Sequence, residues 1–469
     1  MTATTARDDT AIDTRALRTR FRGALLAPGE EGYNEARRVW NGAVDRRPRL
    51  IARCAGADDV VEAVRFAVRH ELPIAVRGGG HSVAGHSVCD DGVMIDLSLM
   101  KAIRVDPEGR TATAAGGVLL GELDRATQRF GLAVPAGIVS HTGIGGLTLG
   151  GGLGHLMRKH GLTVDNLEAV ELVTADGRLR RVDADSDPEL FWGLRGGGGN
   201  FGIATRFEFR LHPIGPMVLG GPIFWPLEEA AQVLAAVREL APQAPDELGI
   251  AIGVAPAPPA PFIPPERFGQ PVLATMLVWA GDPADGAAVM APLRRIGSPL
   301  ADAVRPTPFL ALQSMLDGGA PHGRHYYWKA HRLPDLTDDV VEIVLERMRS
   351  TTTPFAQING WAVGGAVSRV PSDATAVGDR DPGFEMSVTV GWAPGDPEPE
   401  RHVAWVRDAW DALRPHASGV YANFISDEGA AGVEYAYGER LQQLRALKSI
   451  HDPGNVFRMN ANIAPLPCA

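Results

Sequence analysis

A run of three glycines that ends in histidine is the segment of this chain best suited to chemistry. It reads Arg77-Gly-Gly-Gly-His-Ser82 and follows the apolar run at residues 72–76, which is typical of a buried strand. Consecutive glycines allow positive φ angles and a close approach of the backbone to a ligand, and a row of free N–H groups suits a pyrophosphate. The pattern predicts a phosphate cradle with His81 beside the anchored group. The alternative is a surface turn that carries an incidental histidine.

Two more dense glycine clusters favour the phosphate interpretation. Residues 143–154 read Gly-Ile-Gly-Gly-Leu-Thr-Leu-Gly-Gly-Gly-Leu-Gly, and residues 195–202 read Arg-Gly-Gly-Gly-Gly-Asn-Phe-Gly. Loop glycines are normally scattered, so clusters of this density indicate backbone wrapped around one extended ligand that carries phosphate. A nicotinamide-binding unit does not fit, because no cluster lies in a strand–GxGxxG–helix unit with an acidic residue ~20 positions further on.

The order of these motifs resembles the PCMH-type FAD-binding domain of the vanillyl-alcohol oxidase superfamily, in particular the berberine-bridge-enzyme-like oxidases. Among these, the chain resembles bacterial members of the 6-hydroxynicotine-oxidase and enterocin-pathway types. The motifs that carry the resemblance extend from about residue 35 to about residue 465 and include Arg77–Ser82, Gly143-x-Gly-Gly146, Gly150-Gly-Gly152, Met157-Arg-Lys-His-Gly161, Asp165-Asn166, Arg195–Gly202, Tyr421-Ala-Asn423, Asp452-Pro453 and Asn460-x-Asn462.

The resemblance implies an α+β protein, in which a two-lobed FAD-binding domain is followed by an antiparallel-sheet substrate domain covered by helices. We expect these domains at residues 1–215 and 216–418, with an N-terminal appendage at 1–35 that contains a helix at 14–26. A berberine-bridge-like segment at 419–469 then returns to the FAD-binding domain. Periodicity and turn signals predict helices at 58–68, 227–240 and 338–348, strands at 74–76, 93–97, 111–115, 167–174, 249–254, 272–279, 355–363 and 385–392, and a hairpin turn at Asp176-Gly177.

The resemblance also implies how FAD is held. Histidines at the place of His81 bond covalently to the flavin 8α-methyl, and a non-covalent histidine on the phosphate side is the alternative. Many relatives carry a second tether, a cysteine whose place is taken here by Val139. A single covalent bond and a less constrained mouth of the active site are therefore expected. The expected cofactor-binding residues are Arg77, Gly78, Gly79, Gly80, His81, Ser82, Gly137, Thr142, Gly143, Gly145, Gly146, Gly151, Gly152, Asn200, Gly202, Ile203, Tyr421, Asn423, Asn460 and Asn462.

Candidates for catalysis follow from the same resemblance. Thr142 takes the position beside the flavin where a small β-branched side chain accompanies oxidase activity. The phenol that often serves as base in a Tyr-x-Asn-Tyr motif is absent, because this chain reads Tyr421-Ala-Asn-Phe424, and the matching sheet strand offers only Asn359. Tyr421 either faces the pocket or supports the flavin. The remaining candidates lie in a segment expected to be a loop over the flavin, and they are His322, His325, Tyr326 and Tyr327.

Composition restricts the class of protein further. The formal net charge is −10 without a cluster of Lys and Arg, so nucleic-acid binding is not expected. No apolar run reaches the ~18–20 residues of a membrane-spanning helix, and the first residues resemble no secretion signal. We therefore expect a cytoplasmic protein that does not associate with a membrane. Three cysteines without a CxxC pair favour neither a disulfide framework nor a metal site.

We therefore expect an FAD-dependent oxidase with one histidyl–flavin bond, present as a monomer or a homodimer. It removes a hydride from a C–H bond next to O or N of a small secondary-metabolite or alkaloid-like substrate, with O2 as the electron acceptor. Two alternatives remain open. One is an oxygenase that tailors a polyketide-like natural product, and the other is a flavin-fold binding protein without catalysis.

Overall fold

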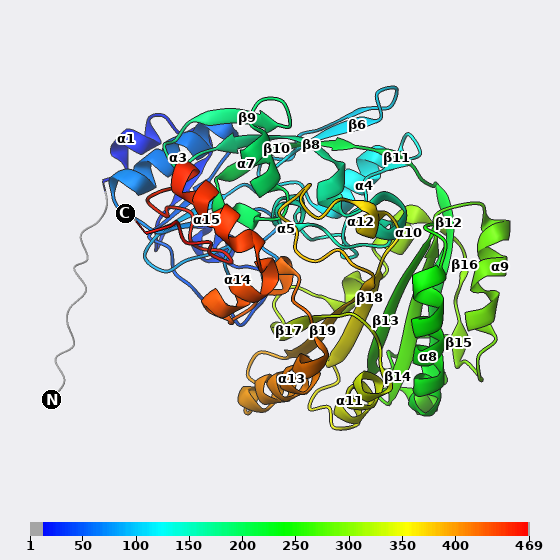
Figure 1. Cartoon of the computed structure of the whole chain (residues 1–469). Helices are drawn as coiled ribbons and strands as arrows, with labels where there is room; N and C mark the ends of the chain where they lie inside the picture. Colours follow the sequence, from blue (N-terminus) through cyan, green and yellow to red (C-terminus); the bar gives the residue numbers. More distant parts are fainter. Residues whose placement is uncertain (1–12, 468–469) are drawn as a thin grey trace.

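Two small sheets in the first half of the chain form two lobes (Figure 1). The computed structural model describes residues 13–467. The first lobe has the strand order β1-β2-β4-β3, made of β1 (Ala24–Leu26), β2 (Leu50–Arg53), β3 (Ile74–Arg77) and β4 (Val93–Asp96). β2 and β3 run parallel to β4, and α3 (Ala57–Arg69) follows β2. Apolar residues at helical spacing bury one face of α3, as predicted.

The expected helix at residues 14–26 is wrong. Only α1 (Arg15–Arg18) is helical, and β1 pairs with β2 instead. The Asp59 carboxylate at the start of α3 accepts hydrogen bonds from the N–H groups of Arg22 and Gly23, at 2.8 and 2.9 Å. A side chain at Gly23 would also overlap a carbonyl oxygen of the residue that ends β2. These tertiary contacts override the local helical pattern.

The second lobe is an antiparallel sheet of order β5-β6-β10-β8-β9. Its strands are β5 (Ile103–Asp106), β6 (Thr111–Ala115), β8 (Leu167–Val173), β9 (Leu179–Asp183) and β10 (Ile203–Arg210). The predicted hairpin at Asp176-Gly177 is confirmed, because Gly177 has a φ of 70° and β8 pairs with β9. Five helices accompany the lobes: α2 (Tyr33–Ala36), α4 (Leu120–Gln128), α5 (Ile144–Gly150), α6 (Met157–His160) and α7 (Pro188–Leu194). The short β7 (Leu132–Ala133) pairs with β11 (His212–Pro213).

A large antiparallel sheet follows, with the order β15-β12-β14-β13-β18-β19-β17 and β16 paired to β12. Its strands are β12 (Met217–Pro226), β13 (Leu248–Pro256), β14 (Pro271–Trp279), β15 (Ala301–Asp302), β16 (Arg305–Pro308), β17 (His325–Leu333), β18 (Gln357–Val363) and β19 (Gly383–Trp392). The predicted strands at 249–254, 272–279, 355–363 and 385–392 all belong to this sheet. The α+β fold class is thereby confirmed.

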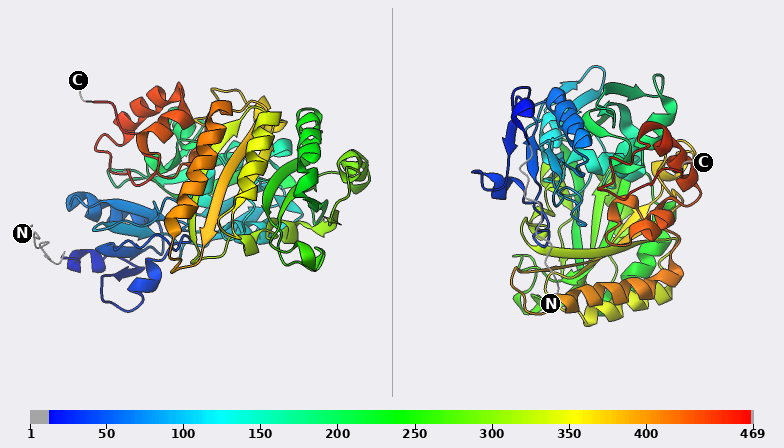
Figure 2. Two further views of the ribbon diagram at one scale, coloured as in Figure 1. Left: turned by 90° about the horizontal axis from the view of Figure 1, so that it is seen from below. Right: turned by 90° about the vertical axis from the view of Figure 1, so that its left-hand side faces the viewer.

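A layer of helices covers one face of the large sheet. Figure 2 shows α8 (Ala230–Leu240), α11 (Asp338–Arg349) and α13 (Pro399–Leu413) side by side across it. Alternate residues of each strand point to opposite faces, so Ile358 and Val388 enter the core under the helices, whereas Asn359 and Ser387 face the lobes. Three further helices lie around the sheet and in its connections: α9 (Pro283–Arg294), α10 (Phe309–Gln313) and α12 (Ala366–Arg369).

The end of the chain packs back onto the lobes. α14 (Gly429–Tyr437) and α15 (Arg440–His451) share one hydrophobic core with the two small sheets. The fully buried Lys448 ammonium donates hydrogen bonds to the Asn200 carbonyl oxygen at 2.6 Å and to the Asp452 carboxylate at 2.7 Å. This anchors α15 to the third glycine cluster. Among the described residues, no helix combines the length and apolarity needed to cross a membrane.

Candidate active site

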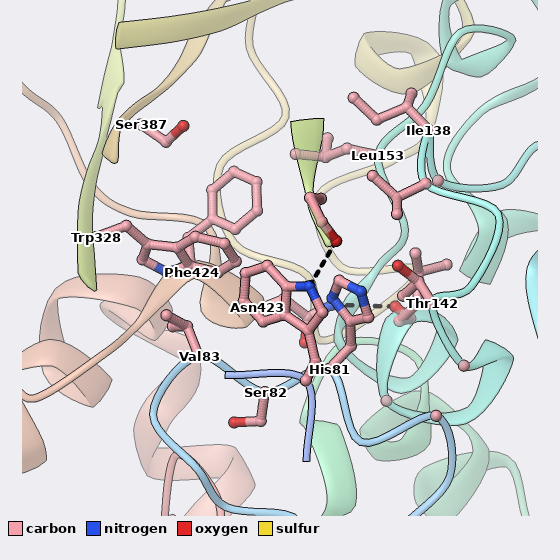
Figure 3. Close-up of a pocket in the computed structure, with 18 of the residues that line it drawn as sticks. His81, Ser82, Val83, Ile138, Thr142, Leu153, Trp328, Ser387, Asn423 and Phe424 are labelled. Carbon is pink, nitrogen blue, oxygen red and sulfur yellow. Dashed lines mark hydrogen bonds between the residues drawn. The ribbon is translucent and has the colours of Figure 1, made fainter. Parts of the chain in front are cut away.

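A cavity of about 1090 Å³ lies between the lobes and the open face of the large sheet. All three glycine clusters contribute backbone to one wall, and strands β12, β13, β14, β17, β18 and β19 supply side chains to the other. In Figure 3, Thr142, Ile138 and Leu153 lie on one side of this cavity and Trp328 and Phe424 on the other, with His81 between them. The structure thus brings the sequence motifs of the whole chain together around one space.

The glycines of this wall are required by close backbone approach. A Cβ at Gly79 would overlap the backbone of Gly143, so the first two glycine clusters contact each other directly. Gly80 has a φ of 70° and Gly152 a φ of 89°, and residues other than glycine rarely adopt these backbone conformations. By contrast, a Cβ at Gly146 would project into open space. The wall is therefore a surface of bare backbone against which an elongated ligand can lie.

Most of the predicted cofactor residues line the cavity, and the others hold its wall. Those on the wall are Gly78, Gly79, Gly80, His81, Ser82, Gly137, Thr142, Gly143, Gly145, Gly146, Asn200, Gly202, Ile203, Tyr421, Asn423 and Asn460. Arg77, Gly151, Gly152 and Asn462 do not line it. The Arg77 guanidinium donates to the Ala36 carbonyl oxygen at 2.6 Å and lies 4.0 Å from the buried Asp96 carboxylate, so it fixes the loop from below.

His81 lies in a stack of aromatic rings. Its imidazole packs against the Trp40 indole, with centroids 4.4 Å apart, and Trp40 packs against Tyr326 at 3.9 Å. The Nε2 atom of His81 lies 2.9 Å from Nδ1 of His141. Burial, together with His141 and His322, lowers the pKa of His81 to about 3. The imidazole is therefore neutral at neutral pH and keeps a ring-nitrogen lone pair free of a proton.

The mouth beside His81 is more constrained than the sequence suggested. The Ser140 N–H and Oγ–H groups both donate to the Asp317 carboxylate, at 2.8 and 2.6 Å. The His141 ring also contacts the His322 ring, with centroids 4.8 Å apart. The segment that contains Val139 is thus tied to the substrate side of the cavity by hydrogen bonds. The expectation of a less constrained mouth is corrected accordingly.

Tyr421 supports the cavity wall. Its phenolic oxygen accepts hydrogen bonds from the Gly152 N–H at 2.5 Å and from Nδ2 of Asn423 at 2.8 Å. Burial raises the pKa of Tyr421 well above the ordinary value of a phenol. A phenol with so high a pKa is a poor base near neutral pH. Of the two roles considered for Tyr421, the geometry favours support of the second glycine cluster.

Three of the four residues expected on a loop over the flavin, His325, Tyr326 and Tyr327, lie instead on the regular strand β17, which pairs along its whole length with β19, whereas His322 lies in the turn before it. Alternation places Tyr326 and Trp328 on the cavity wall. Tyr327 faces the helices, where its hydroxyl donates to the Asp427 carboxylate at 3.0 Å. The His325 ring packs against Trp392, at a centroid distance of 5.9 Å. Because neither His325 nor Tyr327 lines the cavity, neither is placed to act as the catalytic base.

Of the other candidates, Thr142, Asn359 and Tyr326 line the cavity, whereas His322 does not. The Thr142 backbone is fixed on both sides, because its N–H donates to the Val139 carbonyl oxygen and its carbonyl oxygen accepts from Leu120. Asn359 donates from Nδ2 to Oε1 of Gln357 at 3.1 Å. Neither side chain is basic, so a proton acceptor is not supplied by the residues that the motifs single out.

Three cavity residues escaped the sequence motifs. His155 is buried, burial lowers its pKa to about 4, and its Nε2 has no hydrogen-bond partner among residues 13–467. The indole N–H of Trp328 is likewise buried without a partner in the described chain. Arg305 lines the far end of the cavity. Only His155 had a signal in the sequence, because it directly follows the second glycine cluster.

The wall fits FAD in shape and in chemistry. Glycine backbone offers N–H donors without side-chain obstruction, and Oδ1 of the cavity residue Asn460 is a buried acceptor without a partner among the described residues. Such an orphaned acceptor costs free energy unless a ligand satisfies it. The donor-rich wall and this acceptor together suit a long ligand with phosphates and polar rings.

Comparisons with known proteins agree with this fit. A model of the FAD binding domain family matches residues 48–183. An FAD-linked oxidoreductase of Dictyostelium discoideum is 33% identical over 449 residues, which cover 95% of this chain and 95% of that protein. The structure of 6-hydroxy-D-nicotine oxidase from Arthrobacter nicotinovorans matches with a TM-score of 0.85 at 29% identity, over 95% of this chain and 98% of that one.

A more distant structure extends the likeness in fold. The berberine-bridge-enzyme-like protein 1 of Physcomitrella patens has a TM-score of 0.84 at 23% identity, over 96% of this chain and 98% of that one. The PCMH-type FAD-binding architecture inferred from the glycine motifs is thereby confirmed. With near-complete coverage of its relatives, the chain belongs to the FAD-linked oxidoreductases with the berberine-bridge-enzyme-like fold.

Proposed function

We propose that this enzyme is an oxidase that holds FAD covalently through His81 alone and uses O2 as the electron acceptor. The observation that carries the proposal is His81 itself, a neutral imidazole on the cavity wall beside the glycine cradle. A neutral ring has the lone pair needed for a bond to the flavin 8α-methyl. Val139 cannot form a thioether, so no second bond is expected.

Bound FAD supplies a two-electron acceptor for the substrate. The chain supplies the surroundings in which that chemistry takes place. Gly78–Gly80, Gly145 and Gly146 bind the cofactor with backbone, Tyr421 and Asn423 support the second glycine cluster, and Thr142 leaves the space beside its own side chain open to O2. Trp328, Phe424 and Asn359 position a small substrate from the sheet side. We expect a secondary-metabolite or alkaloid-like molecule oxidised at a C–H bond next to O or N.

The test uses the purified holoprotein. Acid precipitation should leave the yellow colour in the pellet, and intact-mass measurement should show one FAD adduct per chain. His81→Ala should abolish the adduct, whereas His86→Ala, which changes another histidine of the same wall, should keep it. Complete release of the flavin from the unmutated protein by acid would contradict the covalent bond.

A second candidate function is an oxygenase that tailors a polyketide-like substrate. The cavity wall favours it in one respect, because no Asp or Glu of residues 13–467 lines the wall and Phe424 replaces the expected phenol. A substrate with an acidic enol or phenol needs little help from a protein base. The products formed under labelled oxygen distinguish the two functions. We rank the oxidase first, because (R)-6-hydroxynicotine oxidase of Paenarthrobacter nicotinovorans, a relative with a named reaction, is an oxidase.

A further inference from the structure

The wall of the cavity carries a single formal charge at neutral pH among the described residues, and that charge belongs to Arg305. Within the described part of the chain, no Asp, Glu or Lys lines the wall. The histidines on it are neutral, because burial lowers the pKa of His81 to about 3 and the pKa values of His86 and His155 to about 4. An isolated charge at a low-dielectric wall focuses its field into the cavity and attracts ligands of the opposite sign.

The Arg305 guanidinium is available to a ligand. It is exposed, and it makes no hydrogen bond or ion pair with any residue in the described range 13–467. The nearby acid Asp302 is already bound by Arg294, whose Nε lies 2.6 Å from the carboxylate. The sheet therefore presents a cation at the cavity without a carboxylate to neutralise it.

The cavity wall towards the β16 edge of the sheet is largely apolar. It includes Pro222, Phe224, Pro256, Phe262, Ala274 and Met276. The Phe224 and Phe262 rings contact each other, with centroids 5.7 Å apart. Burial of the apolar surface of a ring-bearing ligand against such a wall favours binding. The cation thus stands at the end of an apolar arm of the cavity.

The cavity, of which this arm is one end, extends across the whole width of the sheet. β16 and β17 lie at opposite edges, separated by β12, β14, β13, β18 and β19. Six neighbouring-strand steps of ~4.8 Å give a path of roughly 29 Å along the curved sheet. His81 and Trp40 lie under the β17 edge, where Trp40 stacks on Tyr326. The cavity is therefore long enough for a substrate of several rings whose far end reaches β16.

We propose that Arg305 is the anion-binding end of the substrate site, and that the natural substrates are apolar, ring-bearing molecules with a carboxylate or a comparably acidic oxygen group. This inference rests on the proposed function, since it names the class of molecule that the same site takes. It argues against cationic amines, for which the described wall offers no counter-charge.

Two probes with the same rings test the inference: 2-naphthoate, which is anionic, and 2-naphthamide, which is neutral. Binding to the holoprotein is followed by titration calorimetry. We expect Arg305→Gln to weaken the binding of 2-naphthoate about fivefold at low ionic strength. The affinity for 2-naphthamide should stay unchanged. Arg295→Gln is the matched control, because Arg295 is also exposed but does not line the cavity.

Three results would overturn the inference. The first is equal weakening of both probes by Arg305→Gln, which would indicate a packing effect. The second is tighter binding of the cationic 2-naphthylmethylammonium than of 2-naphthoate. The third is failure of the unmutated holoprotein to bind 2-naphthoate. FAD content and the rate of flavin reoxidation, measured on the same preparations, show independently whether the proposed oxidase function holds.

Discussion

The Asp317 carboxylate receives both hydrogen-bond donors of Ser140, the backbone N–H at 2.8 Å and Oγ–H at 2.6 Å. Ser140 follows Val139, which takes the place of the second tethering cysteine of related enzymes, and Asp317 lies near the cavity residues Met315 and Leu316. The two residues therefore link the Val139 segment to the substrate side of the cavity. They also fix the position of His141, the hydrogen-bonding neighbour of His81.

Removing this contact should destabilise the protein measurably. Ser140→Ala should lower the free energy of unfolding by about 1 kcal/mol and Asp317→Ala by about 2 kcal/mol, because the latter also leaves the Ser140 N–H without its acceptor. The double variant should lose less than the sum of the two. Chemical denaturation measures all three, and Ser314→Ala, which changes an exposed serine of the same region, should have little effect. Strict additivity would show that the two residues do not act together.

Thr142 should control the access of O2. Thr142→Leu fills the space beside this side chain, while the backbone hydrogen bonds of residue 142 do not depend on the side chain. We expect reoxidation of the photoreduced flavin to slow on the order of tenfold, which corresponds to ~1.4 kcal/mol of activation free energy.

Stopped-flow mixing with O2 measures that rate without any substrate. Thr142→Val is the matched control, since it keeps the shape and removes only the hydroxyl, and its reoxidation should stay fast. If the leucine variant reoxidises as fast as the other two, Thr142 is not the gate.

His155 should make stability depend on pH. Its folded-state pKa of about 4 lies below the ordinary value of 6.5, so the unfolded chain takes up a proton at mildly acidic pH that the folded chain does not. Stability is therefore lost as the pH falls from about 6.5 towards 4. At pH 5 this group alone costs ~2 kcal/mol relative to neutral pH.

The measurement is the free energy of unfolding at pH 7.5 and pH 5.0. His155→Gln should reduce the loss between the two by ~2 kcal/mol, whereas His70→Gln, which changes an exposed histidine, should not. An unchanged loss in the His155 variant would mean that the imidazole is protonated in the folded protein.

The sequence predicts the glycine-rich wall of the cavity well because the determinants of this wall are local. Gly79, Gly143 and Gly152 each stand in a short glycine-rich run of the sequence. Such runs permit the close contact of Gly79 with Gly143 and the positive φ of Gly152. The hairpin at Asp176-Gly177 and the alternation of β18 are local in the same sense. Each of these elements lies where the motifs or the periodicity place it.

The substrate side was less predictable because its contacts join distant residues. Ser140 and Asp317 are 177 positions apart, and the Trp40 indole donates to the Ala320 carbonyl oxygen across 280 positions. Tyr326 and Tyr327 differ only in which face of β17 they occupy, and that face is fixed by pairing with β19. A one-residue difference in register exchanges the two faces of a strand, so the side-by-side His and Tyr residues gave no indication of which would reach the cavity.

An oxidase and an oxygenase differ in the fate of the O2 atoms, which leave as H2O2 in the first and enter the organic product in the second. An oxidase needs a group that takes the substrate proton, yet Tyr421 has a raised pKa, His325 and Tyr327 face away from the cavity, and Phe424 has no hydroxyl. The one buried unpartnered base on the described wall is His155.

If His155 takes the proton, turnover under ¹⁸O₂ should give stoichiometric H2O2 and no label in the organic product, and His155→Gln should slow that turnover by 10²-fold or more, as loss of general base catalysis does. An acidic substrate oxygenated at the flavin should instead carry ¹⁸O, release little peroxide and turn over at a similar rate in the variant. Product mass spectrometry and a peroxide assay on the same samples give both readings. We expect unlabelled product with peroxide, and label in the product would assign this enzyme to the oxygenases.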